Sequence, residues 1–152
     1  MLARFRSGRP SAPKTSKPVI VVSGLPRSGT SMMMKMLAEG GLEVVTDAVR
    51  SADEDNPNGY FEFEPVKQLT AGHTAWLESA GGKLVKVISA LLEHLPPSLE
   101  YKVVFMERDI KEILASQQKM LDRRNETSQT TDEELTAQFA AHLKAIKYWL
   151  AR

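Results

Sequence analysis

The sequence contains no cysteine among its 152 residues. Disulfide bonds, thiolate-ligated metal sites and a cysteine nucleophile are therefore excluded. Because cysteine-free proteins fit a reducing compartment, we predict a cytoplasmic location. Apolar runs are also short, and none reaches the roughly 18 residues that a membrane-spanning helix requires. We therefore predict no membrane partner.

An excess of charge of one sign is missing too. The 20 lysines and arginines nearly balance the 19 acidic residues, which gives a net charge of +1. Such a chain has no broad positive field to attract nucleic acid, so we predict no nucleic-acid partner. The histidines are few and far apart in the sequence, at positions 73, 94 and 142, and they form no metal-ligand pattern. We therefore predict no metal site.

What is present suits one globular domain. Hydrophobic residues make up 42% of the chain and charged residues 26%, which is ordinary for a folded protein. Residues 1–17 differ, because their charged side chains are all basic and no apolar stretch of a secretory signal accompanies them. We predict a flexible basic tail over residues 1–17 and a folded domain over residues 18–152.

Short β-branched runs alternate with helical segments along the folded part. The pattern predicts strands at residues 19–22, 42–45, 84–88 and 102–106. It predicts helices at residues 29–39, 65–77, 90–95 and 110–123, and a last helix that opens with a capping box at residues 131–134. This alternation predicts an α/β fold, a three-layer sandwich with a central, mostly parallel sheet.

The first strand leads into a loop that suits an anion. Gly24 and Gly29 allow a tight turn and a close approach of backbone N–H groups to a ligand. The helix that follows adds its partial positive charge. Arg27 offers a planar fork of donors, and hydroxyl donors come from Ser28, Thr30 and Ser31. The alternative is a strand–turn–helix with incidental glycines.

The spacing of this loop is that of a Walker A motif with one change. Thr30 stands where the motif G-x-x-x-x-G-K-[ST] has its lysine, and the basic residue is Arg27 instead. Since that lysine normally binds the β- and γ-phosphates of ATP, its absence disfavours an ATPase, a GTPase or a kinase. A P-loop kinase of small molecules remains the less favoured enzyme.

The loop resembles that of a known family. The run from Pro26 through Arg27, Ser28, Gly29 and Thr30 to Ser31 is similar to the 5′-phosphosulfate loop of sulfotransferases that use 3′-phosphoadenosine 5′-phosphosulfate (PAPS). The arginine form resembles the tyrosylprotein branch and related bacterial proteins. The resemblance implies a P-loop-type fold in which these six residues bind PAPS. It also implies transfer of the sulfuryl group to an acceptor hydroxyl without a metal.

A second segment resembles the same family. Arg108 follows a predicted strand, and Ser116 comes eight positions later in a predicted helix. In sulfotransferases an arginine and a serine at this separation bind the 3′-phosphate of PAPS, so the resemblance implies that role here. From the residues alone, Arg108 could instead pair with Asp109 or Glu112, and Ser116 could be a surface residue.

Transfer needs cations beside the bridging oxygen. Arg27 is our first candidate and Lys86 the second, since Lys86 stands near the end of a predicted strand. The cytosolic sulfotransferases have a similar strand with a catalytic histidine two residues after the lysine, where this chain has Ile88. That base is therefore absent. The alternative is that Lys86 is an edge-strand lysine that faces water.

A carboxylate is the candidate base. The run Asn56-Pro57-Asn58-Gly59-Tyr60-Phe61-Glu62 resembles the N-P-x-G-Y-[WYF]-E segment of bacterial sulfotransferase-like proteins. We predict Glu62 as the base, with Asp47 next. The alternative is a solvated acidic loop.

The resemblance covers about residues 19–119. Sulfotransferases normally continue with a further strand and a closing segment, so we expect a C-terminally short sulfotransferase-like domain. Its predicted function is sulfuryl transfer from PAPS to a hydroxyl-bearing acceptor, and the alternative is a non-catalytic nucleotide-binding remnant. The class of acceptor and the oligomeric state stay open.

Overall fold

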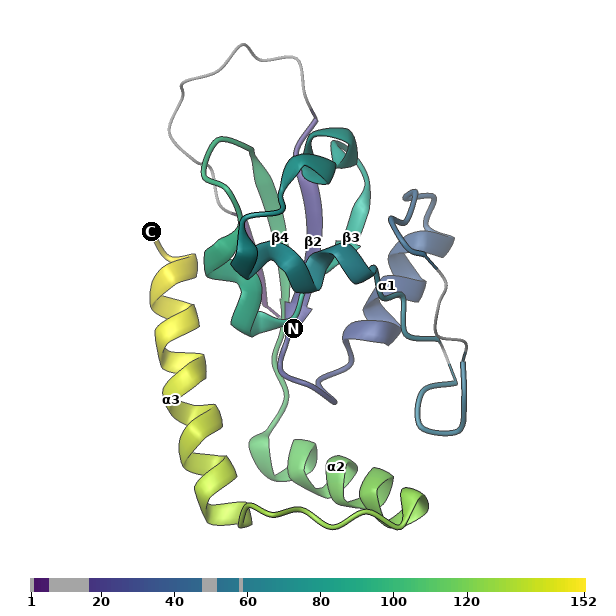
Figure 1. Cartoon of the computed structure of the whole chain (residues 1–152), viewed down its shortest axis with the longest axis vertical. Helices are drawn as coiled ribbons and strands as arrows, with labels where there is room; N and C mark the ends of the chain where they lie inside the picture. The colour runs from purple at the N-terminus through teal and green to yellow at the C-terminus, as the bar shows by residue number, and fades with distance from the viewer. Residues whose placement is uncertain (1, 6–16, 48–51, 58) are drawn as a thin grey trace.

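A four-stranded sheet forms the centre of the computed structural model, which describes residues 2–5, 17–47, 52–57 and 59–152 (Figure 1). The strands lie in the order β1-β4-β2-β3. Three strands are parallel, and their bounds are β2 Val19–Gly24, β3 Leu84–Lys86 and β4 Tyr101–Met106. The fourth strand, β1 (Leu2–Phe5), pairs antiparallel with the outer side of β4. The sheet is therefore mostly parallel, as predicted.

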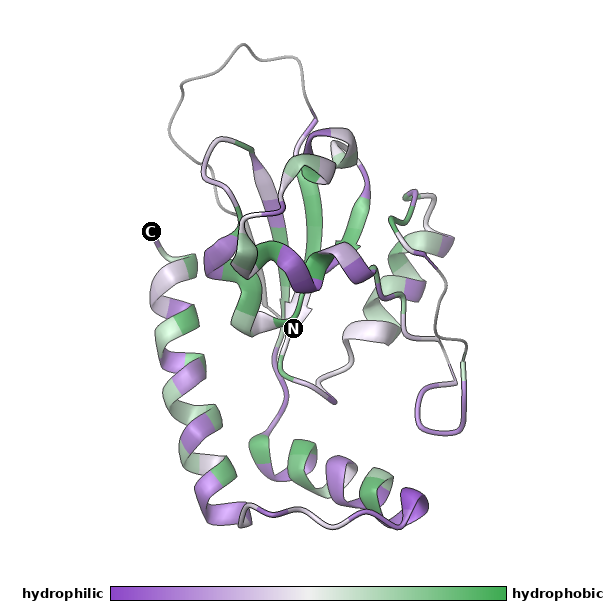
Figure 2. Cartoon of the chain, in the orientation of Figure 1, coloured by the Kyte–Doolittle hydropathy of each residue, from purple (hydrophilic) through white to green (hydrophobic). Residues whose placement is uncertain are grey.

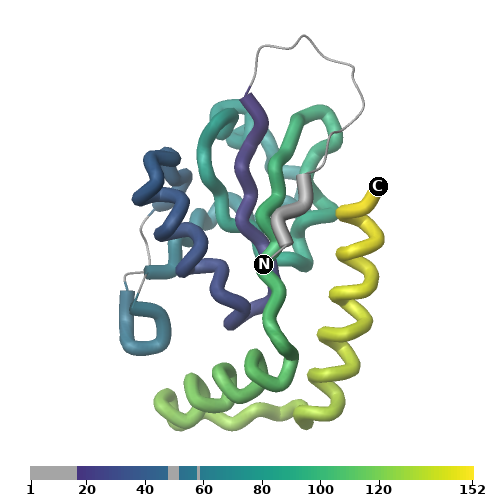
Figure 3. Tube along the Cα trace, turned by 180° about the vertical axis from the view of Figure 1, so that it is seen from behind, coloured from purple at the N-terminus to yellow at the C-terminus, as the bar shows by residue number. Residues whose placement is uncertain are grey.

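Helices cover both faces of this sheet. On one face, helix α1 (Thr30–Glu39) packs over β2 and β3, with Met33 and Met34 buried against Val22 and Leu84. The opposite face carries the larger apolar cluster, which includes Val21, Val85 and Phe105. It is covered by the 3₁₀-helices η1 (Glu64–Ala71), η2 (Ala75–Ala80) and η3 (Ser89–His94) and by helix α3 (Asp132–Leu150). The α/β fold with a sheet between two helical layers is confirmed (Figures 1 and 3).

Burial on both faces explains the apolar run of β2. Val21 and Val22 point to opposite faces, and both are fully buried. Strands with covered faces on both sides have continuous rather than alternating apolar residues. Figure 2 shows the difference from a surface helix, because β2 is hydrophobic along most of its length while hydrophilic and hydrophobic residues alternate along α3.

Helix α2 (Ile110–Arg124) lies beyond the edge at which the three parallel strands end (Figure 1). Its N-terminus is capped by Asp109, whose carboxylate accepts a hydrogen bond from the backbone N–H of Lys111 at 2.8 Å. The next helix, α3, begins with the predicted capping box between Thr131 and Glu134. It then runs back alongside the sheet, where Ile146 and Leu150 join the core. In the described part of the chain, no helix is long and apolar enough to cross a membrane.

Three sequence predictions of secondary structure are wrong in detail. Residues 42–45 form no full strand, since only Val44 makes an isolated bridge to Leu84 at the edge of β3. The single helix predicted over residues 65–77 is two 3₁₀-helices, because Gly72 adopts a left-handed φ of 78° and ends the first of them. The strand predicted over residues 84–88 ends at Lys86.

The predicted flexible tail also differs from the structure in one stretch. Leu2–Phe5 form strand β1 instead, paired with β4 from Leu2 opposite Phe105 to Phe5 opposite Lys102. Composition could not predict this pairing, because the partner strand is about a hundred residues away and the hydrogen bonds use backbone groups. The rest of the predicted tail, apart from Lys17, lies outside the described residues.

Candidate functional site

The predicted anion loop connects the carboxyl end of β2 to the start of α1. Gly29, the residue before the helix, has a left-handed φ of 94°, and Arg27 has one of 63°. The Ser28 hydroxyl closes the turn by donating to the carbonyl of Leu25 at 2.6 Å. A positive φ is uncommon for an arginine, and such residues gather at functional sites. Arg27 therefore has a left-handed backbone conformation just beyond the carboxyl end of β2.

Gly24 packs too closely for a side chain. A Cβ atom on Gly24 would lie 2.5 Å from Ser28 Oγ and 2.8 Å from the carbonyl oxygen of Met106. The Met106 carbonyl belongs to β4 and cannot rotate away without breaking the sheet register. The glycine is thus required where β2 enters the loop.

We expect Gly24→Ala to lower the free energy of unfolding by about 1–3 kcal/mol, the usual cost of overpacking. Chemical denaturation with urea measures this difference. The control is Gly40→Ala, because Gly40 ends α1 with an ordinary helical φ of −72°. Equal stability of Gly24→Ala and the unchanged chain would show that Ser28 and Met106 can move to make room for a Cβ atom.

Arg27 makes hydrogen bonds to the second of the two segments that the sequence predicts to bind anions, the one with Arg108 and Ser116. Its Nε donates to Ser116 Oγ at 3.0 Å, across 89 positions of sequence. Its own carbonyl accepts a hydrogen bond from Nη1 of Arg108 at 3.1 Å. Its Nη1 donates to the carbonyl of Asp55 at 2.9 Å. The structure thus brings the loop, the end of β4 and helix α2 together around one arginine residue.

Arg108 also pairs with Glu112, one of the two acidic partners that the sequence analysis gave as an alternative. Its Nε donates to the carboxylate of Glu112 at 3.0 Å, and both side chains are largely exposed. No hydrogen bond joins Arg108 directly to Ser116 among the described residues, because Ser116 bonds to Arg27 instead. The two side chains predicted to bind one phosphate therefore both contact Arg27, Ser116 at its guanidinium group and Arg108 at its backbone carbonyl.

Lys86 contacts the same loop from β3. Its Nζ donates to Ser31 Oγ at 2.9 Å and to the carbonyl of Tyr60 at 2.8 Å. The alternative that Lys86 faces water is therefore wrong. Ser31 Oγ accepts a second hydrogen bond, from Nδ2 of Asn56 at 2.6 Å. A serine oxygen has two acceptor positions and one proton, so the hydroxyl proton of Ser31 is the part left to bind a ligand.

An acidic segment lies between the loop and α2. Asp53 caps its own turn through the N–H groups of Asp55 and Asn56, and its carboxylate accepts from the hydroxyl of Tyr60. The Asp55 carboxylate, with only 9% of the side chain exposed, is held by Arg123 at 3.2 Å and Arg124 at 3.0 Å. Desolvation lowers the pKa of Arg124, but the hydrogen bond and charge of Asp55 outweigh it, so the net shift is upward.

The two predicted bases lie together at the start of η1. The carbonyl of Glu62 accepts a hydrogen bond from Thr46 Oγ1 at 2.9 Å, and the Asp47 carboxylate accepts from the N–H of Glu64 at 2.6 Å. The hydrogen bond that Lys67 donates to the Glu64 carboxylate raises the pKa of Lys67, and the charges of Glu62 and Asp47 add smaller contributions. The Asp47 side chain therefore binds the backbone of Glu64. Glu62 lies two residues after Tyr60, whose carbonyl accepts a hydrogen bond from Lys86.

Sequence reasoning missed several contacts of the site. Asn56 was included only as part of a family-like run, with no role of its own, and its amide binds Ser31. Arg123 and Arg124 were given no role, yet both bind Asp55, nearly 70 positions away. Their only signal in the sequence is two arginines in the last turn of a helix, where they also suit the helix dipole.

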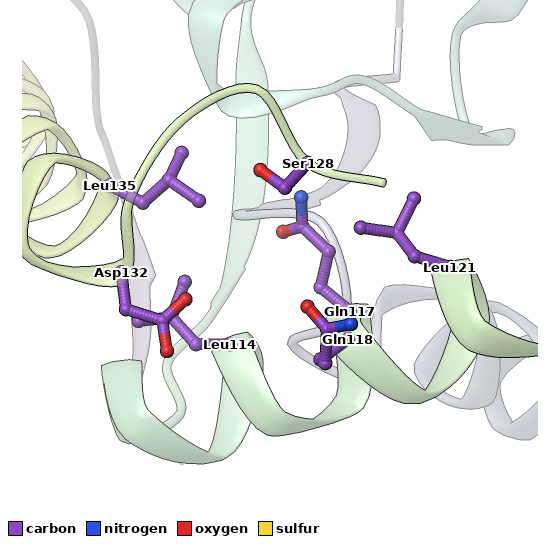
Figure 4. A pocket seen from close by; sticks show the side chains of 7 residues that line it. All are labelled: Leu114, Gln117, Gln118, Leu121, Ser128, Asp132 and Leu135. Carbon is purple, nitrogen blue, oxygen red and sulfur yellow. The ribbon is translucent and has the colours of Figure 1, made fainter. Parts of the chain in front are cut away.

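A small hollow between α2 and α3 lies apart from these groups (Figure 4). Amide and aliphatic side chains and one carboxylate line it, so it offers no cation to an anionic ligand. Its lining residues are Leu114, Gln117, Gln118, Leu121, Ser128, Asp132 and Leu135. Within the described ranges, no cluster of histidine and carboxylate side chains is arranged to hold a metal ion.

Comparisons with known proteins add little. No family model matches the sequence, and no curated protein matches it. The crystal structure of APE1195 resembles the chain with a TM-score of 0.38 and 10% sequence identity, over 86% of this chain and 97% of that one. A similarity this low carries no argument about function, so the function must be argued from the site itself.

Proposed function

We propose that the chain is a sulfotransferase that moves a sulfuryl group from PAPS to an acceptor hydroxyl. The observation that best supports it is that the loop between β2 and α1 carries Arg27 and is contacted at Ser31 by Lys86 of β3. The loop arginine, the lysine at the end of β3, the hydroxyl of Ser31 and the N-terminus of α1 would together bind one anion. Parallel sheets bind ligands at the carboxyl ends of their strands, which is where these groups lie.

The donors suit an anion of this kind. Arg27 has five N–H donors, and the contacts with Ser116 and Asp55 use its Nε and Nη1 groups. The remaining N–H groups of its planar fork match the face of a sulfate or phosphate. The proton of Ser31 adds a further donor. The proposed 5′-phosphosulfate position uses the loop from Pro26 to Ser31, and the proposed 3′-phosphate position uses Arg108 and Ser116.

Transfer then requires positioning and charge stabilisation. The acceptor oxygen attacks sulfur in line, the bond from sulfur to the 5′-phosphate oxygen breaks, and negative charge grows on that oxygen. Arg27 and Lys86 stabilise this charge, and Glu62 is the proposed group that takes the proton of the acceptor hydroxyl. No step requires a metal. The absence of cysteine supports a cytoplasmic setting for this reaction.

A single experiment can distinguish this proposal from two alternatives. A nucleotide-binding protein without transfer would use the loop and Arg108 in the same way. A small-molecule kinase would need magnesium, and Thr30 in place of the Walker lysine argues against it.

The test is a calorimetric titration of the chain with adenosine 3′,5′-bisphosphate, followed by an acceptor screen with sulfur-labelled PAPS. We expect the bisphosphate to bind more tightly than adenosine 5′-phosphate, and label to appear on a hydroxyl acceptor without added magnesium. Binding without transfer to any acceptor would identify a non-catalytic protein. Absence of bisphosphate binding would refute the proposal.

A further inference from the structure

A nearly buried hydroxyl group stands at the start of α1, where the anion loop ends. Ser31 is only 7% exposed, and its oxygen accepts hydrogen bonds from Lys86 Nζ at 2.9 Å and from Asn56 Nδ2 at 2.6 Å. A serine oxygen has two acceptor positions and one proton, so both acceptor positions are occupied. Among the residues that the structure describes, no group accepts the proton of Ser31.

A buried hydroxyl proton without a protein acceptor points to a ligand. Leaving such a donor unpaired costs free energy, so buried hydroxyl groups in folded proteins almost always have a partner. Ser31 is also the second residue of α1, and the backbone N–H groups at a helix N-terminus favour an anion. The acceptor that suits the proton of Ser31 is therefore an oxygen atom of an anion bound at the loop.

Of the two donors to Ser31, Asn56 is the one whose chemistry leaves a choice. The ammonium group of Lys86 can only donate, whereas an amide has a donor end and an acceptor end. In the structure the donor end of Asn56 faces Ser31. With the acceptor end in that place, Ser31 would donate its proton to Asn56 and have none for a ligand. The orientation of one amide group therefore decides whether Ser31 meets a ligand as a donor.

A chain of hydrogen bonds connects the two donors of Ser31. The backbone N–H of Asn56 donates to the Asp53 carboxylate at 2.9 Å. The same carboxylate accepts from the hydroxyl of Tyr60 at 2.7 Å, and the Tyr60 carbonyl accepts from Lys86 at 2.8 Å. Because Tyr60 is itself buried, Asn56 and Lys86 are positioned by a common support.

Carbonyl oxygens beside the loop already accept hydrogen bonds from protein cations. The Asp55 carbonyl accepts from Arg27, and the Tyr60 carbonyl accepts from Lys86. The loop therefore offers a ligand mainly donors, which are the remaining N–H groups of the two cations, backbone N–H groups and the proton of Ser31. An ionised ligand oxygen needs only donors, whereas a ligand oxygen that carries a proton needs an acceptor. The loop therefore suits an anion without an O–H group.

We propose that Asn56 is a positioning residue that fixes Ser31 as a hydrogen-bond donor, so that the loop selects a terminal sulfate group over a protonated terminal phosphate group. This proposal rests on the proposed function, because it assumes that the loop binds the 5′-phosphosulfate of PAPS. A terminal sulfate carries no O–H group, whereas a terminal phosphate keeps one below its second pKa of about 6. Below that pH the two groups have the same shape and charge, and the O–H group is the difference that the site can recognise.

The test compares PAPS with 3′-phosphoadenosine 5′-diphosphate, in which a terminal phosphate replaces the sulfate. Calorimetric titrations below and above the second phosphate pKa give the ratio of the two Kd values, and the 3′-phosphate that both ligands share cancels in this ratio. Below this pKa we expect PAPS to bind about tenfold more tightly, which is within the usual cost of one unsatisfied polar group. Above it the phosphate has lost its proton, so the preference should shrink.

The outcomes separate this inference from the proposed function. Binding of both ligands with no preference for PAPS at the lower pH would overturn the inference and leave the proposed function standing. Binding of neither ligand would refute the proposed function and the inference with it.

Variants of Asn56 show whether its amide causes the preference. Asn56→Ala returns an acceptor position to Ser31, which can then accept from a protonated phosphate, so most of the preference for PAPS should disappear. Gln118→Ala is the matched control, because Gln118 donates its amide to Asp122 within α2, and it should keep the preference. Asn56→Asp keeps the shape of the side chain but can only accept, so it should also lose the preference. A preference that survives in Asn56→Asp would show that the amide oxygen faces Ser31 and would overturn the inference.

A double-mutant cycle distinguishes positioning from a merely structural role. Ser31→Ala removes the hydroxyl through which Asn56 is proposed to act, so it should lose the preference by itself. Adding Asn56→Ala to Ser31→Ala should then leave the ratio of the two Kd values unchanged, because residues that share one contact are not additive. A further change of the ratio in the double variant would show that Asn56 acts by another route, against the proposal. If Asn56→Ala does not fold, Asn56→Asp takes its place in the cycle.

Discussion

Replacing Arg27 with alanine should lower the rate of sulfuryl transfer by about 10²–10³-fold, the usual loss when one preorganised donor to the transition state is removed. Its guanidinium group is preorganised by three features. The loop fixes its backbone at a φ of 63°, Ser116 holds Nε at 3.0 Å, and the Asp55 carbonyl holds Nη1 at 2.9 Å. Binding of adenosine 3′,5′-bisphosphate should weaken less than the rate, because the bisphosphate lacks the sulfuryl group.

The control for this variant separates charge from loop position. Arg124→Ala removes one of the two guanidinium contacts to the Asp55 carboxylate and leaves Arg123 to hold it. If Arg27 mattered only by tethering the acidic segment, Arg124→Ala should reproduce much of its effect. We expect at most a few-fold loss for Arg124→Ala. Single-turnover kinetics with labelled PAPS compare the two variants, and unchanged kinetics for Arg27→Ala would refute its assignment to the transferred group.

The parts of the fold that the sequence could predict depend on local order. The apolar run of β2, the glycines of the loop and the Met-rich start of α1 are adjacent in the chain, so strand, turn and helix follow from their spacing. The capping box at Thr131 is equally local, and its predicted hydrogen bonds are present.

Edges and short helices were harder to predict. Residues 42–45 are β-branched enough for a strand, but they meet β3 at the edge of the sheet through Val44 alone. Residues 65–77 have helical composition, and the left-handed Gly72 divides them. In both cases a single tertiary contact or backbone angle outweighs the local preference, which is weak for short segments.

Only those residues of the site that belong to the loop itself could be predicted from the sequence. Arg27 and Ser31 follow from the loop, but their partners Ser116, Asp55 and Asn56 come from other elements. No spacing rule links residues 89 positions apart, because the distance between them depends on how α2 packs beyond the sheet.

The packing of α2 also decides what Arg108 does. We expect Arg108→Ala to weaken binding of adenosine 3′,5′-bisphosphate by roughly 1.5–3 kcal/mol, the usual worth of a charge-assisted contact. Binding of adenosine 5′-phosphate should change far less, because that ligand lacks the 3′-phosphate. Isothermal titration calorimetry with both ligands measures the difference directly.

The structure supplies a rival reason for any loss, since Nη1 of Arg108 donates to the carbonyl of Arg27 and so supports the loop. If this support were the whole role, both ligands would weaken equally and the 3′-phosphate assignment would fail. Glu112→Gln provides the matched control, because it removes the negative charge that holds Nε at 3.0 Å and leaves Arg108 in place. A guanidinium group released from Glu112 can turn toward a phosphate at lower electrostatic cost, so Glu112→Gln should bind the bisphosphate at least as tightly as the unchanged chain.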